Sequence, residues 1–400
     1  MAENMGIRLG IIGLGRGFML TLPALRAHPR IRLTAAFDVR QEAREHFAAQ
    51  FAAAAFDSVD ALLASGDVDA VYIASPHEFH AEQTIAALRA GKHVLVEKPM
   101  ATGIRDCMAM EAAARSSGRV LVVGPSHGFD APVQAAADMV HSGEFGALRM
   151  VTALNFTDFM FRPRRPEELD TARGGGVVYS QAAHQIDVVR RIVGRPVTSI
   201  RATAGNWDDS RPSEGAYSAF ISFADGACAT LTYSGYAHYD SDELVGWISE
   251  LGHEKDPAAY GDARRKLAAL SREDEEAAKL SRAYGAQAAQ EASPPAPHHE
   301  HFGFVLASCE RADLKITPKG IAIYGDTQRR FIDIPPPALP RAEVLAEFIG
   351  AITGEREPIH DGRWGLETMA CCEALLESSR HRREIAPASI INQTKEKNRP

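Results

Sequence analysis

The strongest constraint on the fold lies near the N-terminus, where a cluster of glycines follows a short apolar run. Ile7–Ile12 is typical of a buried strand, and Gly13-Leu14-Gly15-Arg16-Gly17 comes directly after it. A helical segment then extends to about Ala27, and a second strand, Leu33–Phe37, ends at Asp38. A strand, a glycine turn, a helix and an acidic residue roughly 20 positions beyond the glycines are the parts of a dinucleotide-binding unit.

Each part predicts a contact with a dinucleotide. Gly13 would permit the tight turn, and Gly15 would let main-chain N–H groups approach a pyrophosphate at a helix N-terminus. The carboxylate of Asp38 would accept hydrogen bonds from the ribose hydroxyls and repel a 2′-phosphate, which favours NAD. Arg40 lies close enough in sequence to leave NADP open. Phe18 occupies the third small position of the motif, so helix and strand must pack differently there.

Strands and helices go on alternating as far as Ser126-His127, which predicts a doubly wound parallel sheet, and thus an α/β domain, in residues 1–128. The later strands are expected at Ala70–Ala74, His93–Val96 and Val120–Gly124. The helices are expected at Arg40–Phe51, Val59–Ala64, Glu78–Ala90 and Ile104–Ser116.

The strand His93–Val96 ends in Glu97-Lys98-Pro99. Ligands of open parallel sheets bind outside the carboxyl ends of the strands, so a lysine at this point is placed for chemistry. The proline stops the strand because it lacks the N–H group that a ladder needs. The competing interpretation of Lys98 is a strand-end lysine in water.

After a helix at about Ala131–Ser142 the pattern changes to strands with hairpin-type connections, which predicts an α+β domain with an antiparallel sheet over residues 129–386. Its strands are expected at Leu148–Phe156, Val197–Ala204, Ala216–Phe223, Ala227–Tyr233, Phe304–Cys309, Gly320–Tyr324 and Gln328–Ile334. Its helices are expected at Ala131–Ser142, Ser180–Val193, Arg341–Ile352 and Leu366–Arg380. Residues 251–301 are interpreted as an insertion between two strands, and residues 387–400 as a flexible tail.

Composition narrows the class of protein. The 400 residues are too many for one ordinary core, and 45% hydrophobic with 24% charged residues describe a soluble protein. A formal charge of −8 argues against nucleic acid and anionic membranes as partners. Five scattered cysteines fit a reducing compartment, and no segment resembles a signal peptide or a membrane span, so we expect a cytoplasmic protein. His298, His299 and His301 follow prolines without paired ligands, so no metal is expected.

Four motifs stand in order along the chain and carry a resemblance: Gly13-Leu14-Gly15, Ser75-Pro76 with His80, Glu97-Lys98-Pro99, and Gly174-Gly175-Gly176 leading to His184 and Asp187. With them the chain resembles the glucose–fructose oxidoreductase / inositol dehydrogenase (Gfo/Idh/MocA) family over most of its length, apart from residues 251–301. The resemblance implies an N-terminal Rossmann domain and a C-terminal domain whose large, open, mostly antiparallel sheet supports homodimers or homotetramers. It also implies hydride transfer between NAD or NADP and a hydroxyl-bearing carbon.

Carried over position by position, the resemblance implies that Lys98 and His184 are active-site residues, with Asp187 orienting or neutralising the site. The family often has an aspartate four residues before that histidine, where this chain has Ser180. The expected cofactor contacts are Gly13, Gly15, Arg16, Gly17, Phe18, Asp38, Arg40, Ser75, Pro76, His80, Glu97 and Lys98.

These roles also make chemical sense without the resemblance. Oxidising an alcohol needs a base for the hydroxyl proton and a cation that stabilises the developing alkoxide. His184 can be the base and Lys98 the cation, or Lys98 can relay the proton itself. A histidine near a helix start can also be structural, but the preceding Gly174-Gly175-Gly176, which permits close backbone approach, favours the catalytic interpretation.

A narrower resemblance concerns the substrate. Phe161–Thr171, Val178–Arg190 and Asp361–Gly365 look like the phthalate 4,5-cis-dihydrodiol dehydrogenase branch, whose members oxidise a dicarboxylated cyclohexadiene diol to a catechol in aromatic catabolism. Arginine suits a carboxylate, so Arg162 and Arg165 are candidate substrate ligands, with a solvated surface loop as the alternative. Ser180 and His127 complete the expected substrate contacts.

The sequence therefore predicts an NAD-dependent oxidoreductase, with a phthalate-type cis-4,5-dihydrodiol and a sugar or inositol as competing substrates. A cofactor-sensing regulator without catalysis stays open as a function of another class, as does an enzyme that retains and recycles its NAD(H). Lys98 and His184 favour catalysis, whereas Ser180 weakly favours the regulator.

Overall fold

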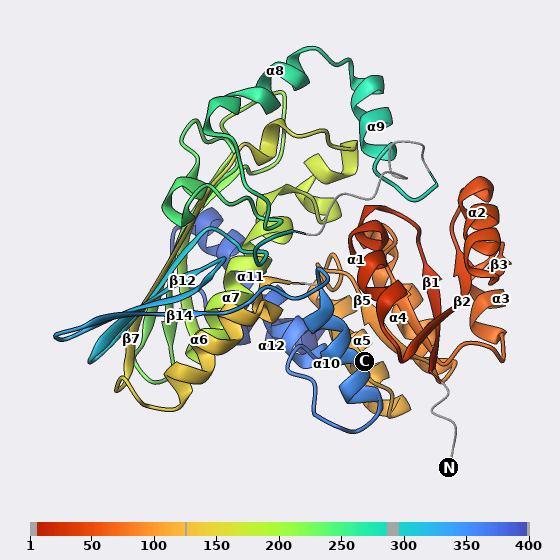
Figure 1. The fold of residues 1–400 in the computed structure, drawn as a ribbon, viewed down its shortest axis with the longest axis horizontal. Helices are drawn as coiled ribbons and strands as arrows, with labels where there is room; N and C mark the ends of the chain where they lie inside the picture. Colours follow the sequence, from red (N-terminus) through yellow and green to blue (C-terminus); the bar gives the residue numbers. More distant parts are fainter. Residues whose placement is uncertain (1–5, 125, 286–295, 398–400) are drawn as a thin grey trace. The chain divides into compact units, whose positions relative to one another are not determined.

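The computed structural model describes residues 6–124, 126–285 and 296–397, and these form two compact units (Figure 1). The first unit comprises the described parts of Met1–Pro125, Glu276–Pro295 and Leu339–Leu366, and the second those of Ser126–Glu275, Ala296–Ala338 and Glu367–Pro400. The sequence predicts a single boundary near residue 128, whereas the chain returns to the first unit twice. Residues 286–295 of the predicted insertion and 398–400 of the predicted tail lie outside the described residues.

The first unit is built on a six-stranded sheet of order β3-β2-β1-β4-β5-β6, in which every pairing is parallel. Every residue of β4 and the last three of β5 are buried, as expected of strands that helices cover on both faces. The doubly wound parallel sheet is thus confirmed. The strands are β1 (Ile7–Ile12), β2 (Ile31–Phe37), β3 (Ala54–Phe56), β4 (Ala70–Ile73), β5 (His93–Val96) and β6 (Leu121–Val123).

The helices of this unit follow the strands in the predicted alternation. They are α1 (Arg16–Ala27), α2 (Gln41–Phe51), α3 (Val59–Ala64), α4 (His80–Arg89), α5 (Ile104–Ser117) and, from the later part of the chain, α10 (Ala342–Ile352). Helix α10 packs against α1, so the unit contains a helix that the sequence assigns to the other domain. The sequence prediction also omits β3, whose three residues are too few to show a period.

The second unit is built on an eight-stranded sheet of order β14-β13-β12-β11-β7-β10-β9-β8. Strands β7 and β10 pair in parallel, and all other neighbours pair antiparallel, which confirms the mostly antiparallel sheet. The sequence prediction omits β12, although its apolar and polar residues alternate. The strands are β7 (Leu148–Phe156), β8 (Val197–Gly205), β9 (Ala216–Phe223), β10 (Cys228–Ser234), β11 (Phe304–Cys309), β12 (Ala312–Thr317), β13 (Gly320–Gly325) and β14 (Arg329–Asp333).

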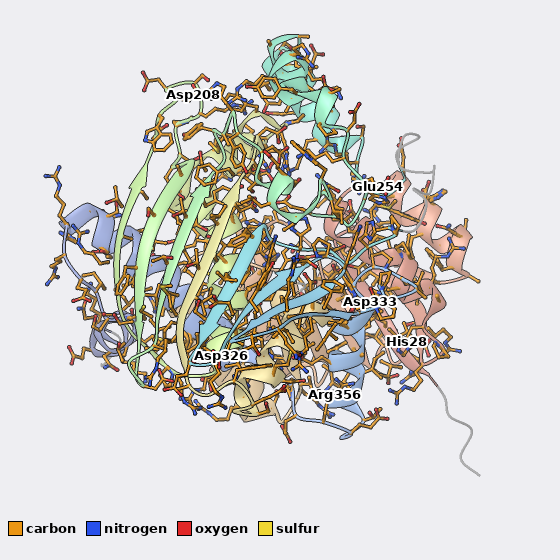
Figure 2. All side chains as sticks on the ribbon, turned by 60° about the vertical axis from the view of Figure 1, so that its left-hand side comes forward. His28, Asp208, Glu254, Asp326, Asp333 and Arg356 are labelled. Carbon is orange, nitrogen blue, oxygen red and sulfur yellow. The ribbon has the colours of Figure 1, made fainter. Side chains whose placement is uncertain are left out.

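The two faces of this sheet differ. Helices α6 (Ala131–His141) and α7 (Ala183–Val193) pack on one face, where they contact β12 and β7. Figure 2 shows the strands side by side, with Asp326 at the turn between β13 and β14. On the opposite face, Met150 and Phe220 are exposed at 40% and 44%. Thr230 pairs with Phe220 of β9 and with Thr152 of β7, so these side chains share one face. Met150 lies two residues before Thr152 and therefore points to the same side.

The predicted insertion is helical in part. It contains α8 (Asp262–Ala268) and α9 (Arg272–Leu280) between β10 and β11. The predicted flexible tail is instead α12 (Pro387–Lys397), which contacts β8. The preceding Ile385 forms a β-bridge with Ile200, which holds the start of the helix in place. The polar sequence of this segment does not predict such a tertiary contact. Helix α11 (Gly362–His381) precedes it. Among the described residues, no helix is both long and apolar enough to cross a membrane.

Candidate functional site

The glycine turn after β1 has the geometry that a dinucleotide needs. Gly13 has φ +92°, and a Cβ there would lie 2.6 Å from the main-chain nitrogen of Ser75, so only glycine fits. Gly15 is the N-cap of α1, which begins at Arg16, and as a glycine it has no side chain that could cap the helix. The N-terminus of α1 therefore offers main-chain N–H groups to an anion, and the turn fits a pyrophosphate.

The carboxylate of Asp38 lies at the end of β2 and is nearly buried. Its Oδ2 accepts a hydrogen bond from the main-chain N–H of Leu14 at 2.7 Å. Its Oδ1 accepts from the main-chain nitrogen and from Nε of Arg40, at 2.9 and 3.0 Å. Asp38 thus joins the glycine turn to the β2 end, where a ribose hydroxyl would bind.

The loops after β4 and β5 are held together by His80. This fully buried ring lies 2.9 Å from the carbonyl oxygen of Pro99 and 3.0 Å from that of Ser75. Burial lowers the pKa of His80, and hydrogen bonds to both carbonyls offset this only in part. Pro76 precedes the short helix η1 (His77–Phe79). The part of His80 in cofactor binding would accordingly be to shape these loops.

Glu97 and Gly17 approach closely at the start of α1. A Cβ on Gly17 would lie 2.7 Å from Oε1 of Glu97, so the glycine makes room for this carboxylate. The same oxygen accepts from the hydroxyl of Tyr72 at 2.7 Å and lies 3.4 Å from Nη1 of Arg341. Lys98 follows directly and is half-buried. The expected cofactor residues therefore gather at the carboxyl ends of four neighbouring parallel strands.

Phe18 departs from the dinucleotide motif and shows how the helix compensates. Its ring is fully buried and packs against Phe47 of α2 and Tyr284, with ring centroids 6.0 and 5.3 Å away. Only its main chain is therefore positioned to contact a cofactor. A small residue at this position would let α1 and α2 pack more closely. Here the aromatic cluster fills the space between them.

In the second unit, His184 lies in the first turn of α7, directly after the π-helical turn η6 (Val178–Ala182). Such turns are frequent at functional sites. Its Nδ1 lies 3.2 Å from Oγ of Ser126, and its ring centroid lies 4.8 Å from that of His127 and 5.0 Å from that of Phe302. His184 is thus a nearly buried imidazole in an aromatic setting, in contact with Ser126 of the 126–128 loop.

Two carboxylates support this loop. Nδ1 of His127 lies 2.7 Å from Oδ2 of Asp130, and Oδ2 of Asp187 accepts from the main-chain N–H of Gly128 at 3.0 Å. Asp187 is therefore placed to orient the loop that contacts His184. His127, Asp130 and Glu300 each offer a ligand atom within 4.8 Å of the others, in a part of the described chain where the sequence predicts no metal.

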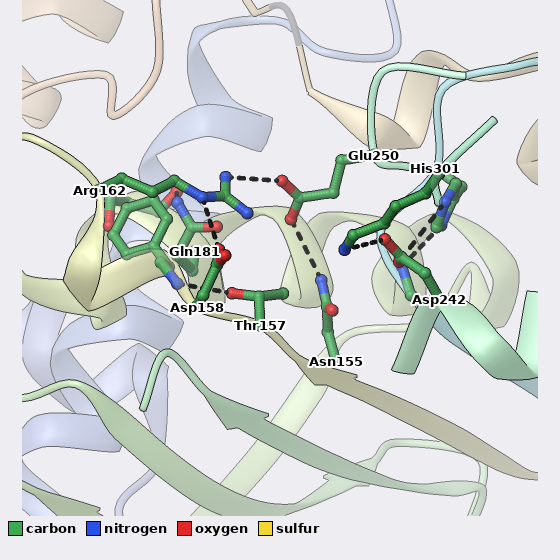
Figure 3. A network of polar contacts seen from close by, with 12 residues as sticks. Asn155, Thr157, Asp158, Arg162, Gln181, Asp242, Glu250 and His301 are labelled. Atoms are coloured by element: carbon green, nitrogen blue, oxygen red, sulfur yellow. Dashed lines mark hydrogen bonds and ion pairs between the residues drawn. The ribbon is translucent and has the colours of Figure 1, made fainter. Parts of the chain in front are cut away.

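A polar network centred on Glu250 lies in the same unit (Figure 3). Its Oε2 lies 3.3 Å from Nη1 of Arg162, and its Oε1 accepts from the amide of Asn155 at 3.4 Å. Nε of Arg162 donates to Asp158 at 3.0 Å. Burial raises the pKa of Glu250, but Arg162, with His127 and His301, lowers it below its usual value. Burial lowers the pKa of Arg162, whereas Glu250 and Asp158 raise it overall.

The other expected substrate residues have partners within their own segments. Nε of Arg165 lies 3.1 Å from Glu167 and 3.7 Å from Glu168. The hydroxyl of Ser180 donates to the carbonyl oxygen of Gly176. The structure therefore places Arg162 next to the Glu250 network and holds Arg165 on its own short helix.

Sequence reasoning missed Glu250, Asp130 and Phe302. Asp130 stands three residues after His127, a spacing that puts both on one turn and could have been noticed. Glu250 and Phe302 lie at the edges of the insertion and carry no periodic signal. Their contacts join residues about 90 to 175 positions apart, which only the tertiary structure reveals.

A parallel Rossmann sheet with a glycine turn and an acidic β2 end, joined to a second unit with a buried histidine, defines a nucleotide-dependent dehydrogenase. Residues 7–125 match the family model of the oxidoreductase family with an NAD-binding Rossmann fold, and residues 133–248 match that of the GFO/IDH/MocA C-terminal domain. The chain belongs to the Gfo/Idh/MocA family and is an NAD-binding oxidoreductase, as the sequence predicts.

Known proteins resemble the chain along nearly its whole length. It is 43% identical over 377 residues to the 1-carboxy-3-chloro-3,4-dihydroxycyclo hexa-1,5-diene dehydrogenase of Comamonas testosteroni, covering 94% of this chain and 95% of that protein. A solved structure from Bordetella bronchiseptica RB50, assigned as a dehydrogenase, has 38% identity and a TM-score of 0.89, with 96% of this chain and 100% of that chain covered.

Another structure shares the fold at low identity. The WlbA dehydrogenase of Bordetella pertussis, solved with NADH and UDP-GlcNAcA, is 23% identical with a TM-score of 0.68, covering 95% of this chain and 98% of that chain. Together with the family match, these relatives show that the chain is a dehydrogenase that acts on hydroxyl-bearing carbons.

Proposed function

We propose that the protein oxidises a carboxylated cis-dihydrodiol of cyclohexadiene to the corresponding catechol with NAD, as an enzyme of aromatic catabolism in the cytoplasm. The observation that carries this proposal is the 43% identity, over 94% of the chain, to a dehydrogenase whose name describes a carboxylated dihydroxycyclohexadiene. A phthalate-type 4,5-dihydrodiol is the substrate that we favour within this class.

The chemistry divides between an O–H proton and a C–H hydride. His184 takes the proton of one hydroxyl, and NAD, when bound, would supply the acceptor for the hydride of the carbon that bears this hydroxyl. The resulting hydroxy-ketone loses its remaining ring proton from carbon and gains one on oxygen, which gives the aromatic catechol. Because aromatisation is strongly downhill, the reaction tolerates Ser180 where the family often has a carboxylate.

Lys98 and Asp187 have supporting roles in this proposal. Lys98 stabilises the developing alkoxide, since its ammonium group follows the carboxyl end of β5, where ligands of parallel sheets bind. Asp187 holds the main chain of Gly128 and so positions the loop whose Ser126 contacts His184.

Aromatic side chains near His184 favour a cyclic diene over a fully hydroxylated sugar. The ring of Phe302 lies 5.0 Å from His184 and stacks on Tyr233 at 6.1 Å with an interplanar angle of 10°. Arg162, in the same unit, supplies a guanidinium group for a substrate carboxylate.

The test is a substrate panel with the purified protein and NAD, monitored by NADH absorbance. Carboxylated cis-dihydrodiols should be turned over, with the catechol identified by mass spectrometry. The matched compounds are the methyl ester of each dihydrodiol, which keeps the ring and removes the charge, and myo-inositol. Turnover of inositol or sugars without turnover of the acids would make the protein a polyol dehydrogenase instead. Binding of NAD(H) without turnover of any compound would favour a regulator.

We also infer a homodimer or homotetramer that forms through the open face of the second unit's sheet. Met150 and Phe220 are exposed there, and Tyr324 and Phe331 continue the same face at 39% and 51% exposure. Flat apolar surface of this kind is typical of an interface between copies. Native mass spectrometry should show an oligomer that Phe220→Glu dissociates, whereas Trp207→Glu, also exposed but outside the strands, should leave it intact.

A further inference from the structure

The insertion returns to the first unit through Tyr284, which contacts the glycine turn. The main-chain N–H of Tyr284 donates to the carbonyl oxygen of Leu14 at 3.1 Å. Its buried ring packs among Phe18, Phe47 and Phe51, with centroids 5.3, 6.2 and 6.5 Å away. Its hydroxyl donates to the side chain of Gln50. The ring therefore anchors the main chain of residue 284 beside the turn expected to bind the pyrophosphate.

This anchored main chain holds Arg40. Nη1 of Arg40 donates to the carbonyl oxygen of Tyr284 at 3.0 Å, and Nη2 donates to that of Leu14 at 2.8 Å. Nε donates to Asp38 at 3.0 Å, and Nη2 also lies 3.2 Å from the second oxygen of that carboxylate. All three nitrogens of the guanidinium group are thus directed at acceptors of the protein. Two of these acceptors are main-chain atoms, which cannot turn away as a side chain can.

The position of this network matters for the cofactor. The ribose of a dinucleotide is recognised by the acidic residue at the end of β2, here Asp38, and an arginine near that residue accommodates the 2′-phosphate of NADP. A phosphate on the 2′ oxygen would lie beside Asp38 and meet the carbonyl oxygens of Leu14 and Tyr284, all of them acceptors. Arg40 is the arginine that would neutralise it, but its donors point at these same acceptors.

We propose that the Tyr284 segment is a second determinant of cofactor specificity, which fixes Arg40 across Asp38 and thereby excludes the 2′-phosphate of NADP. Specificity for NAD then has two sources. Asp38 repels the 2′-phosphate by charge. Tyr284 keeps the guanidinium group of Arg40 in place, so that this group cannot neutralise the phosphate. The inference rests on the NAD-binding Rossmann unit alone and holds whichever alcohol is the substrate.

The test measures dissociation constants of NAD and NADP by protein fluorescence for wild type, Asp38→Ser, Tyr284→Ala and the double variant. Asp38→Ser alone should raise the affinity for NADP relative to NAD by less than about tenfold, because Arg40 stays fixed. Adding Tyr284→Ala should raise this ratio at least about another tenfold, since Arg40 can then turn to the phosphate. Arg40→Ala in the double variant should remove this additional gain.

Two controls separate specificity from general damage. Tyr284→Phe keeps the ring packing and should match wild type, and Tyr260→Ala removes an exposed tyrosine from the same insertion and should change neither constant. Thermal melting checks the fold, and Tyr284→Leu, which keeps apolar volume, takes the place of an unstable Tyr284→Ala. The proposal is overturned if Asp38→Ser alone reaches the ratio of the double variant, or if the gain persists without Arg40.

Discussion

The hydroxyl of Ser126 lies 3.2 Å from Nδ1 of His184. A hydrogen bond at one ring nitrogen selects the tautomer and fixes the ring plane, and so determines which nitrogen acts as the base. If Nδ1–H of His184 donates to this hydroxyl, Nε2 is the atom that takes the substrate proton. The base that we propose, His184, therefore has a hydroxyl group beside its ring, whereas the family often has an aspartate one helical turn away at the position of Ser180.

We expect His184→Ala to lower kcat by about 10²- to 10⁴-fold, the range for a lost general base. NAD affinity should stay within about twofold, because the expected cofactor residues lie in the first unit and His184 in the second. Steady-state kinetics and NAD titration check this. His238→Ala, an exposed histidine of the same unit, should behave as wild type. Near-normal turnover of His184→Ala would mean that Lys98 or water is the base.

Lys98→Ala should lower kcat by about 10²-fold or more, because a cation at the developing alkoxide is lost. Lys98→Arg should recover part of this loss, since it restores the charge but not the shape of the ammonium group. Lys266→Ala removes an exposed lysine and is the matched control. Equal activity of Lys98→Ala and wild type would show that the lysine is only a strand-end residue, and circular dichroism would reveal any loss of fold.

Arg162→Lys should raise KM for a carboxylated dihydrodiol by about tenfold, while KM for its methyl ester and Kd for NAD stay unchanged. Lysine keeps a charge near Glu250 and Asp158, so that the buried carboxylate of Glu250 is not left unpaired. Arg165→Ala should have a smaller effect, because Arg165 is held by glutamates of its own loop. Equal KM changes for acid and ester would show that Arg162 is structural.

Arg211→Met should lower the free energy of unfolding by about 3–5 kcal/mol, as expected when one partner of a buried ion pair is removed. Arg211 and Glu275 are 2.6 Å apart with side chains 5% and 11% exposed, and Glu275 also accepts from the main chain of Arg164. Chemical denaturation measures the change. Arg265→Met breaks an exposed pair with Asp262 and should cost less than about 1 kcal/mol.

Acidification should destabilise the first unit partly through His80. Burial holds the pKa of the folded histidine below 6.5, so as pH falls through about 6.5 the unfolded chain takes up a proton that the folded chain does not. The stabilising contribution is complete above this pH and is lost as the pH falls toward the folded pKa. The melting temperature of wild type should therefore fall more steeply between about pH 7 and 5 than that of His80→Gln. Parallel curves would contradict this.

The sequence by itself determined the Rossmann unit. A glycine at positive φ, an apolar strand and an acidic strand end are local requirements that hold within about 30 residues, so Gly13, Gly15 and Asp38 can be read from the chain. The lysine at the end of β5 can likewise be recognised from its neighbours in the sequence. Strand alternation also predicts the mostly antiparallel sheet, because each strand shows its own period.

The tertiary structure alone decided which distant residues meet. Glu250 reaches Arg162, Phe302 reaches His184, and Tyr284 reaches the glycine turn 270 positions earlier in the chain. Helix α12 likewise forms where the sequence predicts a flexible tail, next to a bridge from Ile385 to Ile200. Such contacts leave no local pattern, because they depend on which segments each unit brings together when it folds and not on the neighbours of each residue along the chain.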